Sequence, residues 1–361
     1  MKALQITYYY FLIISLFTLS SCRKNQDPAP EEDFQFAQGL YLLNEGNMSM
    51  NKASLDFYDY ASGSYERNVF NRANPSIVLG LGDVGNDLKI YGSKIYMAIN
   101  ASNKVEVVDA HSVKRIKKID LINVRNITCY GGKVYVSSYD TDINLGNPSP
   151  NGKVLEIDTA SLEITRTVLV GRQPNGLAVA QGKLYVANSG GYDPSAYECS
   201  LSVIDLGSFT EIKRIEVGIN LNKVEADKLG NIWVTSLGDY DNIPENLFVI
   251  DPKTDQLIHT FNLPISNFWL DSEQVYTYSG TYYQRFPLTQ WDQPEKLLSD
   301  ELAQRIQLPY GIAVDPQNKH FFITDAKNYV TPGTLYEFDS KGNLIHSWET
   351  GDIPAHMDFL R

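Results

Sequence analysis

One short pattern recurs seven times along this chain of 361 residues. Each copy begins at a turn, often with glycine, and continues as a strand that has an aromatic residue near its middle. The copies are residues 39–44, 92–98, 132–137, 182–188, 230–235, 274–278 and 319–324. A regular repeat restricts the architecture more than a single motif does, because each copy must be one structural unit that packs on its neighbours.

A second pattern, an alternating apolar strand that ends in aspartate, follows most of these copies. The aspartates are Asp59, Asp109, Asp158, Asp205, Asp251 and Asp339, and the sixth copy has Gln284, Arg285 and Phe286 in its place. Two further alternating strands, one before the aromatic strand and one after the aspartate, give four strands to each unit. Four-stranded units at a period of about 45 residues predict an all-β, seven-bladed β-propeller.

The two ends of the repeat region predict how the ring closes. The first copy starts directly with its aromatic strand and lacks the strand that precedes it elsewhere, whereas residues 355–360 form an extra strand at the C-terminus. We expect the C-terminal strand to pair into the first blade, which leaves no long open edge.

The N-terminus predicts export and lipidation. Lys2 precedes an apolar run over residues 8–19, and the small residues that follow end in Cys22. That run is shorter than the ~20 residues that a membrane span needs, and it is typical of a lipoprotein signal peptide. An ordinary signal peptide with a chance cysteine is the alternative. The expected parts are a signal peptide (1–21), a flexible polar tether from lipidated Cys22 (22–33) and the propeller (34–361), held at the outer membrane and facing the cell exterior.

The charge argues against a nucleic-acid partner, and the positions of the cysteines argue against a disulfide. The formal net charge is −12, and the only basic run, residues 114–118, alternates like a strand. Nucleic-acid affinity comes mainly from cations on phosphates, so no nucleic-acid partner is expected. Cys129 and Cys199 lie in different repeats at strand-like positions, and we expect buried free thiols rather than a disulfide.

One face of the predicted ring has the features of a binding surface. Long loops after the aromatic strands (46–52, 140–152, 190–199, 238–246, 280–284 and 328–333) share this face with the connections between blades, and the other face has tight turns. The candidate ligand-binding residues are Asn47, Arg125, Arg172, Asn175, Asn222, Tyr192, Tyr240, Tyr282, Tyr283, Tyr310, Tyr329 and His356. Tyrosine, amide and arginine side chains suit a large ligand with a flat or apolar body and polar edges.

Three kinds of function remain open on these residues. The first is capture of a bulky small-molecule ligand, and the second is adhesion to a glycan or peptide. The third is a hydrolase or lyase with a metal ion in the central opening, which Glu45, Asn175 and Asn222 could hold. The sequence has no Gly-x-Ser-x-Gly or His-Glu-x-x-His motif, so we expect no catalytic residue, no metal and no cofactor.

The repeats resemble the YncE-like propellers and, more closely, the DUF5074-type surface lipoproteins of Bacteroidetes. The resemblance covers residues 36–361 and rests on YLLNEGN at 41–47, on GK[V/L]YV at 132–136 and 182–186, and on RQPNGLAV at 172–179. Its best-understood type is similar to the cobalamin-capturing lipoproteins called BtuG. The resemblance implies a monomer without enzyme activity that captures a corrinoid (cobalamin, vitamin B12) as a ligand and passes it to a TonB-dependent outer-membrane transporter.

Overall fold

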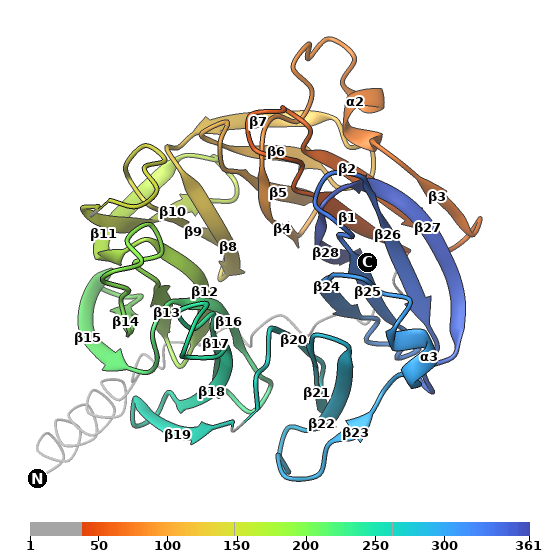
Figure 1. The fold of residues 1–361 in the computed structure, drawn as a ribbon. Coiled ribbons are helices and arrows are strands. Elements are labelled where there is room, and N and C mark those ends of the chain that lie inside the picture. Colours follow the sequence, from red (N-terminus) through yellow and green to blue (C-terminus); the bar gives the residue numbers. More distant parts are fainter. Residues whose placement is uncertain (1–37, 148, 262) are drawn as a thin grey trace, which may run out of the picture. The chain divides into compact units, whose positions relative to one another are not determined.

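The computed structural model describes residues 38–361, except 148 and 262. In this part of the chain, seven four-stranded antiparallel sheets form a ring (Figure 1). The predicted seven-bladed β-propeller is confirmed. The predicted signal peptide, Cys22 and the tether lie outside the described residues. No helix among the described residues is long and apolar enough to cross a bilayer.

Each blade runs from an inner strand near the axis to an outer strand at the rim. The inner strands are β28 (Pro354–Leu360), β4 (Gly85–Tyr91), β8 (Val124–Tyr130), β12 (Pro174–Ala180), β16 (Leu221–Ala226), β20 (Asn267–Leu270) and β24 (Pro309–Val314). The second strands are β1 (Gly39–Asn44), β5 (Lys94–Ile99), β9 (Lys133–Ser138), β13 (Lys183–Asn188), β17 (Ile232–Ser236), β21 (Gln274–Ser279) and β25 (Phe321–Asp325).

The outer half of each blade carries the aspartate pattern. The third strands are β2 (Ser54–Asp59), β6 (Lys104–Asp109), β10 (Asn151–Asp158), β14 (Ser200–Asp205), β18 (Asn246–Asp251), β22 (Tyr282–Pro287) and β26 (Pro332–Phe338). The outer strands are β3 (Ser64–Glu66), β7 (Arg115–Asp120), β11 (Ile164–Arg172), β15 (Thr210–Glu216), β19 (Gln256–Thr260), β23 (Glu295–Lys296) and β27 (Leu344–Asp352). Two short helices, α2 (Val69–Ala73) and α3 (Asp300–Ala303), lie in connections between blades.

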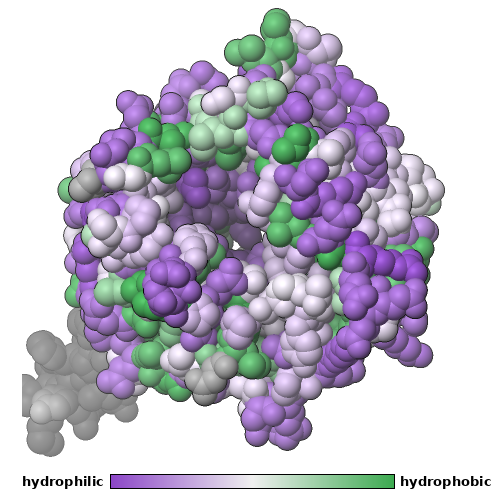
Figure 2. All heavy atoms as spheres, in the orientation of Figure 1, coloured by the Kyte–Doolittle hydropathy of each residue, from purple (hydrophilic) through white to green (hydrophobic). Residues whose placement is uncertain are grey.

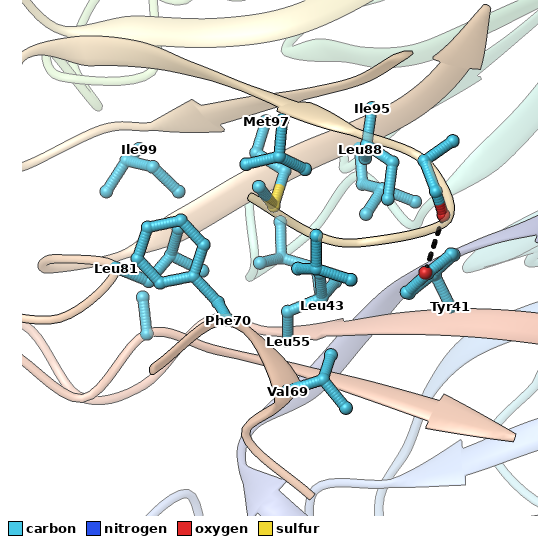
Figure 3. Packing of buried hydrophobic residues seen from close by; sticks show 14 of the residues in the cluster. Tyr41, Leu43, Leu55, Val69, Phe70, Leu81, Leu88, Ile95, Met97 and Ile99 are labelled. Atoms are coloured by element: carbon cyan, nitrogen blue, oxygen red, sulfur yellow. Dashed lines mark hydrogen bonds between the residues drawn. The ribbon is translucent and has the colours of Figure 1, made fainter. Parts of the chain in front are cut away.

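The aromatic residue of each second strand is buried between blades. These residues are Tyr41, Tyr96, Tyr135, Tyr185, Trp233, Tyr276 and Phe322. Tyr41 shares an apolar layer with Leu43 and Met97, and its hydroxyl donates a hydrogen bond to the Ala110 carbonyl in the next blade at 2.7 Å (Figure 3). The repeated aromatic residue therefore joins neighbouring blades as well as filling the core.

The repeated aspartate folds the turn between the third and fourth strands. The blades are numbered along the chain, from blade 1 with β1 and β28 to blade 7 with β24 to β27. In blade 2, one carboxylate oxygen of Asp109 accepts hydrogen bonds from the Ser112 N–H and hydroxyl, both at 2.8 Å. These bonds hold the pKa of Asp109 below its ordinary value. Blade 6 lacks the aspartate, and there Arg285 on β22 pairs with Glu295 on β23 at 2.8 Å.

The C-terminal strand closes the ring as predicted. Strand β28 pairs antiparallel with β1, with Gly39 opposite Leu360 and Leu43 opposite His356. The first and last strands of the described chain therefore share one sheet, and the blade they form has the same strand order as the other six.

The two cysteines of the described residues are free thiols, as predicted, but both are partly exposed rather than buried. Burial raises the pKa of the Cys129 thiol. The Cys199 thiol donates a hydrogen bond to a Glu216 carboxylate oxygen at 2.6 Å, and this bond together with burial raises the pKa of Cys199 to about 11. Both side chains therefore stay protonated at neutral pH.

Candidate functional site

A cavity of about 970 Å³ follows the ring axis and is lined mainly by the inner strands. Figure 2 shows a hollow in the middle of the ring, bordered mainly by hydrophilic and intermediate residues. Side chains alternate along a strand, so every second residue of an inner strand faces this space. The end at which the inner strands begin, between the loops that follow the second strands, is called the mouth below.

Most inner strands contain a β-bulge at the mouth. The pairing register shifts around Asn86 in β4, Arg125 and Asn126 in β8, Asn175 and Gly176 in β12, Asn222 and Lys223 in β16, and Tyr310 and Gly311 in β24. A bulge bends the strand and redirects a side chain, and bulges are common next to functional sites. The bulges explain why polar residues of the inner strands gather around the mouth.

Tyrosines from blades 5, 6 and 7 form one wall of the mouth, which we call the tyrosine wall. It consists of Tyr240, Tyr278, Tyr310 and Tyr329. The rings of Tyr310 and Tyr329 meet edge to face, with their centroids 5.8 Å apart. Tyr240 and Tyr329 are 70% and 44% exposed, so their rings are open to a ligand.

Two of these tyrosines have a strained backbone. The φ angles of Tyr240 and Tyr329 are +61° and +62°, in the left-handed region that bulky residues rarely adopt. Each such residue costs about 1 kcal/mol. The surrounding loop maintains the strain at Tyr240: the Asp239 carboxylate accepts the N–H groups of Asp241 and Ile243, and a side chain at Gly238 would lie 1.9 Å from the Ile243 carbonyl oxygen.

A hydrogen-bond network around Glu45 fixes part of the mouth. The Tyr310 hydroxyl donates to one carboxylate oxygen of Glu45 at 3.0 Å, and the His356 Nε2 lies 3.3 Å from the other. Burial and the Glu45 charge raise the pKa of Tyr310 well above its ordinary value, so its hydroxyl stays protonated. The other ring nitrogen of His356 lies 3.9 Å from Asp87. Glu45 therefore links the first blade to the tyrosine wall.

The opposite wall is polar. Arg125, Asn86 and Asn126 line the cavity from blades 2 and 3. The Arg125 guanidinium lies over the ring of Tyr139, with its carbon 4.9 Å from the ring centroid. The Tyr139 hydroxyl in turn donates to the side-chain oxygen of Asn175 at 2.6 Å, which holds the ring in place.

Charged side chains line the cavity below the mouth. Lys223 pairs with Glu225 on the same strand at 3.2 Å. Burial lowers the pKa of Lys223. Burial also acts to lower the pKa of Lys89, but the carboxylates of Asp87, Glu225 and Asp358 outweigh it and raise that pKa. Any ligand group that reaches this depth must therefore be polar.

The structure brings together half of the predicted binding residues. Arg125, Asn222, Tyr240, Tyr310, Tyr329 and His356 all line the cavity. Asn47 stands beside it and donates a hydrogen bond from its amide to the Tyr329 carbonyl, so it positions a loop of the tyrosine wall. These residues come from four blades, and the bulges and loops make them converge at one mouth.

Three other predicted residues hold loops and strands together. Arg172 pairs with Glu198 at 3.1 Å and so ties down the loop between β13 and β14. Asn175 is buried, and its oxygen is taken by Tyr139. Tyr192 is also buried, and its hydroxyl contacts the Asn123 amide at 3.1 Å. These residues shape the surroundings of the mouth rather than its lining.

Residues 280–284 differ from the prediction. The expected long loop is only Gly280 and Thr281, because β22 begins at Tyr282. Tyr282 is exposed on that strand and does not line the cavity. Tyr283 faces the other side of the strand and is 1% exposed in the core between blades 6 and 7. The expectation that Tyr283 contacts a ligand is corrected, since core packing covers its ring.

Sequence reasoning missed the charged side chains inside the cavity. They occur two residues apart on inner strands, as Asp87 with Lys89 and Lys223 with Glu225. On a strand predicted to line the axis, charges at this spacing share one face and must point into the ring. That spacing was a usable signal.

The described residues contain no group of three or more histidine, cysteine, aspartate and glutamate side chains arranged to hold a metal ion. The residues named for a metal have other partners: Glu45 contacts Tyr310 and His356, and the Asn175 oxygen accepts from Tyr139.

Residues 38–353, from β1 through β27, match the protein family described as "Domain of unknown function (DUF5074)". The chain belongs to the DUF5074 family. No curated protein matches its sequence.

Solved structures share the fold of this DUF5074 protein. A quinonprotein alcohol dehydrogenase-like protein of Bacteroides thetaiotaomicron is 14% identical, with a TM-score of 0.66 and coverage of 91% of this chain and 79% of that one. A hypothetical selenium-binding protein of Sulfolobus tokodaii is 10% identical, with a TM-score of 0.66 and coverage of 91% and 94%. Hydrazine synthase of Kuenenia stuttgartiensis is 14% identical, with a TM-score of 0.56 and coverage of 75% and 88%. At these identities the likeness establishes the fold alone.

Proposed function

We propose that this DUF5074 protein captures a corrinoid at the mouth of its central cavity. The observation that carries the proposal is the arrangement of two unlike walls around one opening, with tyrosines from blades 5 to 7 facing Arg125, Asn86 and Asn126 from blades 2 and 3. A corrinoid has a flat macrocycle edged with amides. Tyrosine rings supply flat contact area for the macrocycle, and amide and guanidinium groups supply hydrogen bonds for its edges.

The strained tyrosines support a binding role. Tyr240 and Tyr329 keep a left-handed backbone at a cost in stability, and they expose their rings to solvent at the mouth. Neither feature helps the core. Backbone strain of this kind is concentrated at functional sites, where it fixes a side chain in the geometry that a ligand needs.

We infer that the protein binds its ligand without transforming it and passes it to a TonB-dependent outer-membrane transporter. The resemblance to the BtuG type and the lipoprotein motif at Cys22 support this role at the cell surface. Exposed apolar side chains on loops at the mouth end also support docking to a membrane protein: Met48, Met50, Val78, Leu79 and Val330.

Isothermal titration with cyanocobalamin tests the proposal. We expect one-to-one binding in the submicromolar range. Replacing Tyr240 or Tyr329 by alanine is expected to weaken binding by at least about 1 kcal/mol each, as for an exposed aromatic anchor. Tyr282→Ala is the matched control, because Tyr282 is similarly exposed (48%) but lies outside the cavity.

Two results would reject the proposal. The first is the absence of binding heat with cyanocobalamin, after which a glycan and peptide screen would follow. The second is an equal loss of cyanocobalamin affinity in Tyr240→Ala and Tyr282→Ala, which would mean that the ligand does not bind at the mouth. The transporter step has its own test, in which a TonB-dependent transporter encoded beside this gene should form a stable complex with the protein on size-exclusion chromatography.

A further inference from the structure

Arg125 differs from the other arginines of the ring. Each arginine between Arg67 and Arg305 apart from Arg125 forms an ion pair with a carboxylate. Among the described residues, Arg125 forms no ion pair, and its buried Nε has no hydrogen-bond partner. Arginine is rarely left in this state, because a partly buried guanidinium without partners is costly.

The Arg125 side chain is held in place before any ligand binds. It lies at the bulge of β8, and its guanidinium rests on the Tyr139 ring. Tyr139 is itself buried and held through its hydroxyl by Asn175. A cationic group stacked on a fixed ring loses little freedom when a ligand binds, which favours affinity.

A second polar side chain without a partner lies on the neighbouring inner strand. Asn86 sits at the bulge of β4 and lines the cavity, and its amide forms no hydrogen bond with the described residues. The two strands are tied at this level, because the Asp87 carboxylate accepts the N–H of Ile127 at 2.8 Å. Arg125 and Asn86 therefore offer their donors on one wall of the mouth.

We propose that Arg125 and Asn86 form a receptor for an anionic oxygen group of the ligand, specifically a phosphate ester. The planar guanidinium fork matches the oxygens of a phosphate, and the amide adds one donor. The inference rests on the proposed function at the same mouth. In a cobalamin the anionic group is the phosphodiester of the nucleotide loop, so this group faces blades 2 and 3 while the macrocycle faces the tyrosine wall.

The carboxylates nearby are already engaged. Glu45 contacts Tyr310 and His356. The two oxygens of Asp87 accept backbone N–H groups of Leu88 and Ile127. Neither carboxylate forms an ion pair with Arg125, so its guanidinium stays available to an anionic group at the mouth.

The test compares two corrinoids on three variants. Dicyanocobinamide lacks the nucleotide loop and its phosphodiester, whereas cyanocobalamin has both. We expect Arg125→Gln to weaken cyanocobalamin binding about 10- to 100-fold, the range for a hydrogen bond to a charged group, and to change dicyanocobinamide binding less than about twofold. Arg125→Lys keeps the charge without the fork and should give an intermediate loss for cyanocobalamin. Arg305→Gln is the matched control, because Arg305 pairs with Glu301 at the start of α3.

An equal effect of Arg125→Gln on the two corrinoids would overturn the phosphate assignment and leave corrinoid capture standing. Phenyl phosphate, a phosphate ester with a flat ring, tests the receptor without any corrinoid. Its ³¹P resonance should broaden saturably with the wild-type protein and with Arg305→Gln, but not with Arg125→Gln. If the resonance broadens in this pattern but neither corrinoid binds, the corrinoid is rejected as the ligand and the anion receptor is supported. If all variants broaden the resonance equally, or no variant broadens it, and neither corrinoid binds, the anion receptor is overturned.

Discussion

The contact between blades 4 and 5 should depend on one buried hydroxyl. Tyr185 on β13 donates to a carboxylate oxygen of Asp255 at 2.7 Å, and Lys183 pairs with the same carboxylate at 2.8 Å. Asp255 lies in the turn between β18 and β19, so the network spans two blades. Burial acts to raise the pKa of Asp255, but the bonds from Lys183 and Tyr185 outweigh it and lower that pKa.

Removing the Tyr185 hydroxyl tests this contact. A hydrogen bond to a charged group contributes about 1.5–3 kcal/mol, and Asp255 keeps Lys183, so we expect Tyr185→Phe to lower the free energy of unfolding by about 1.5 kcal/mol. Asp255→Ala leaves both the buried hydroxyl and Lys183 without this carboxylate, and we expect a loss of about 3 kcal/mol. The double variant should lose less than the sum of the two single losses, by about 1 kcal/mol or more, because both changes remove the same bond.

Urea unfolding followed by tryptophan fluorescence measures these losses through the transition midpoint. Tyr130→Phe is the control, because Tyr130 is 53% exposed at the end of β8, and its change should stay within about 0.5 kcal/mol. A loss below about 0.5 kcal/mol for Tyr185→Phe would refute the reasoning. Additive losses in the double variant would also refute it, since the network would then not couple the blades.

Three further outcomes follow from the fold. A chain that ends before Pro354 lacks β28, and we expect its circular dichroism melt to lose cooperativity and its midpoint to fall, because β1 then has a free edge. The turn aspartates Asp109 and Asp205 have lowered pKa values, so their stabilising bonds are fully present above the ordinary aspartate pKa of about 4 and are lost as the pH falls further. The melting temperature should therefore drop as the pH falls below about 4. Asp109→Asn should make that drop smaller, because it removes one of the titrating groups. Glu216→Gln should bring the pKa of Cys199 down from about 11 toward its ordinary value, which would speed its reaction with iodoacetamide at pH 9.

The repeat determined the fold because it records strand period, turn chemistry and blade number together. Every copy supplies an aromatic residue such as Tyr185 for the space between blades, and most supply an aspartate such as Asp109 for the outer turn. Both roles are local and recur along the chain, so the residues that fill them are recognisable without the structure. The closing strand was predictable for the same reason, since the first copy lacks one strand and the C-terminus has one to spare.

The site was predictable only in part, because it depends on which side of a strand a residue faces and on small shifts in register. Tyr282 and Tyr283 look alike in a loop, yet once β22 starts at Tyr282 one ring is exposed and the other is buried. Conversely, the bulge at Arg125 decides that its side chain reaches the mouth, and no residue pattern marks that bulge. Arg172 is an arginine in a similar connection, but Glu198 holds it in a loop.

The pairing of β28 with β1 also sets an order of events during biosynthesis. The ribosome makes β1 before the strands of the other six blades and makes its inner neighbour after them, so β1 waits for its partner until those blades have been made. A growing chain can form the sheets of blades 2 to 7 one after another, but it cannot complete blade 1. Ring closure is therefore the last step in assembling the ring, and until it happens the nascent protein presents an open strand edge.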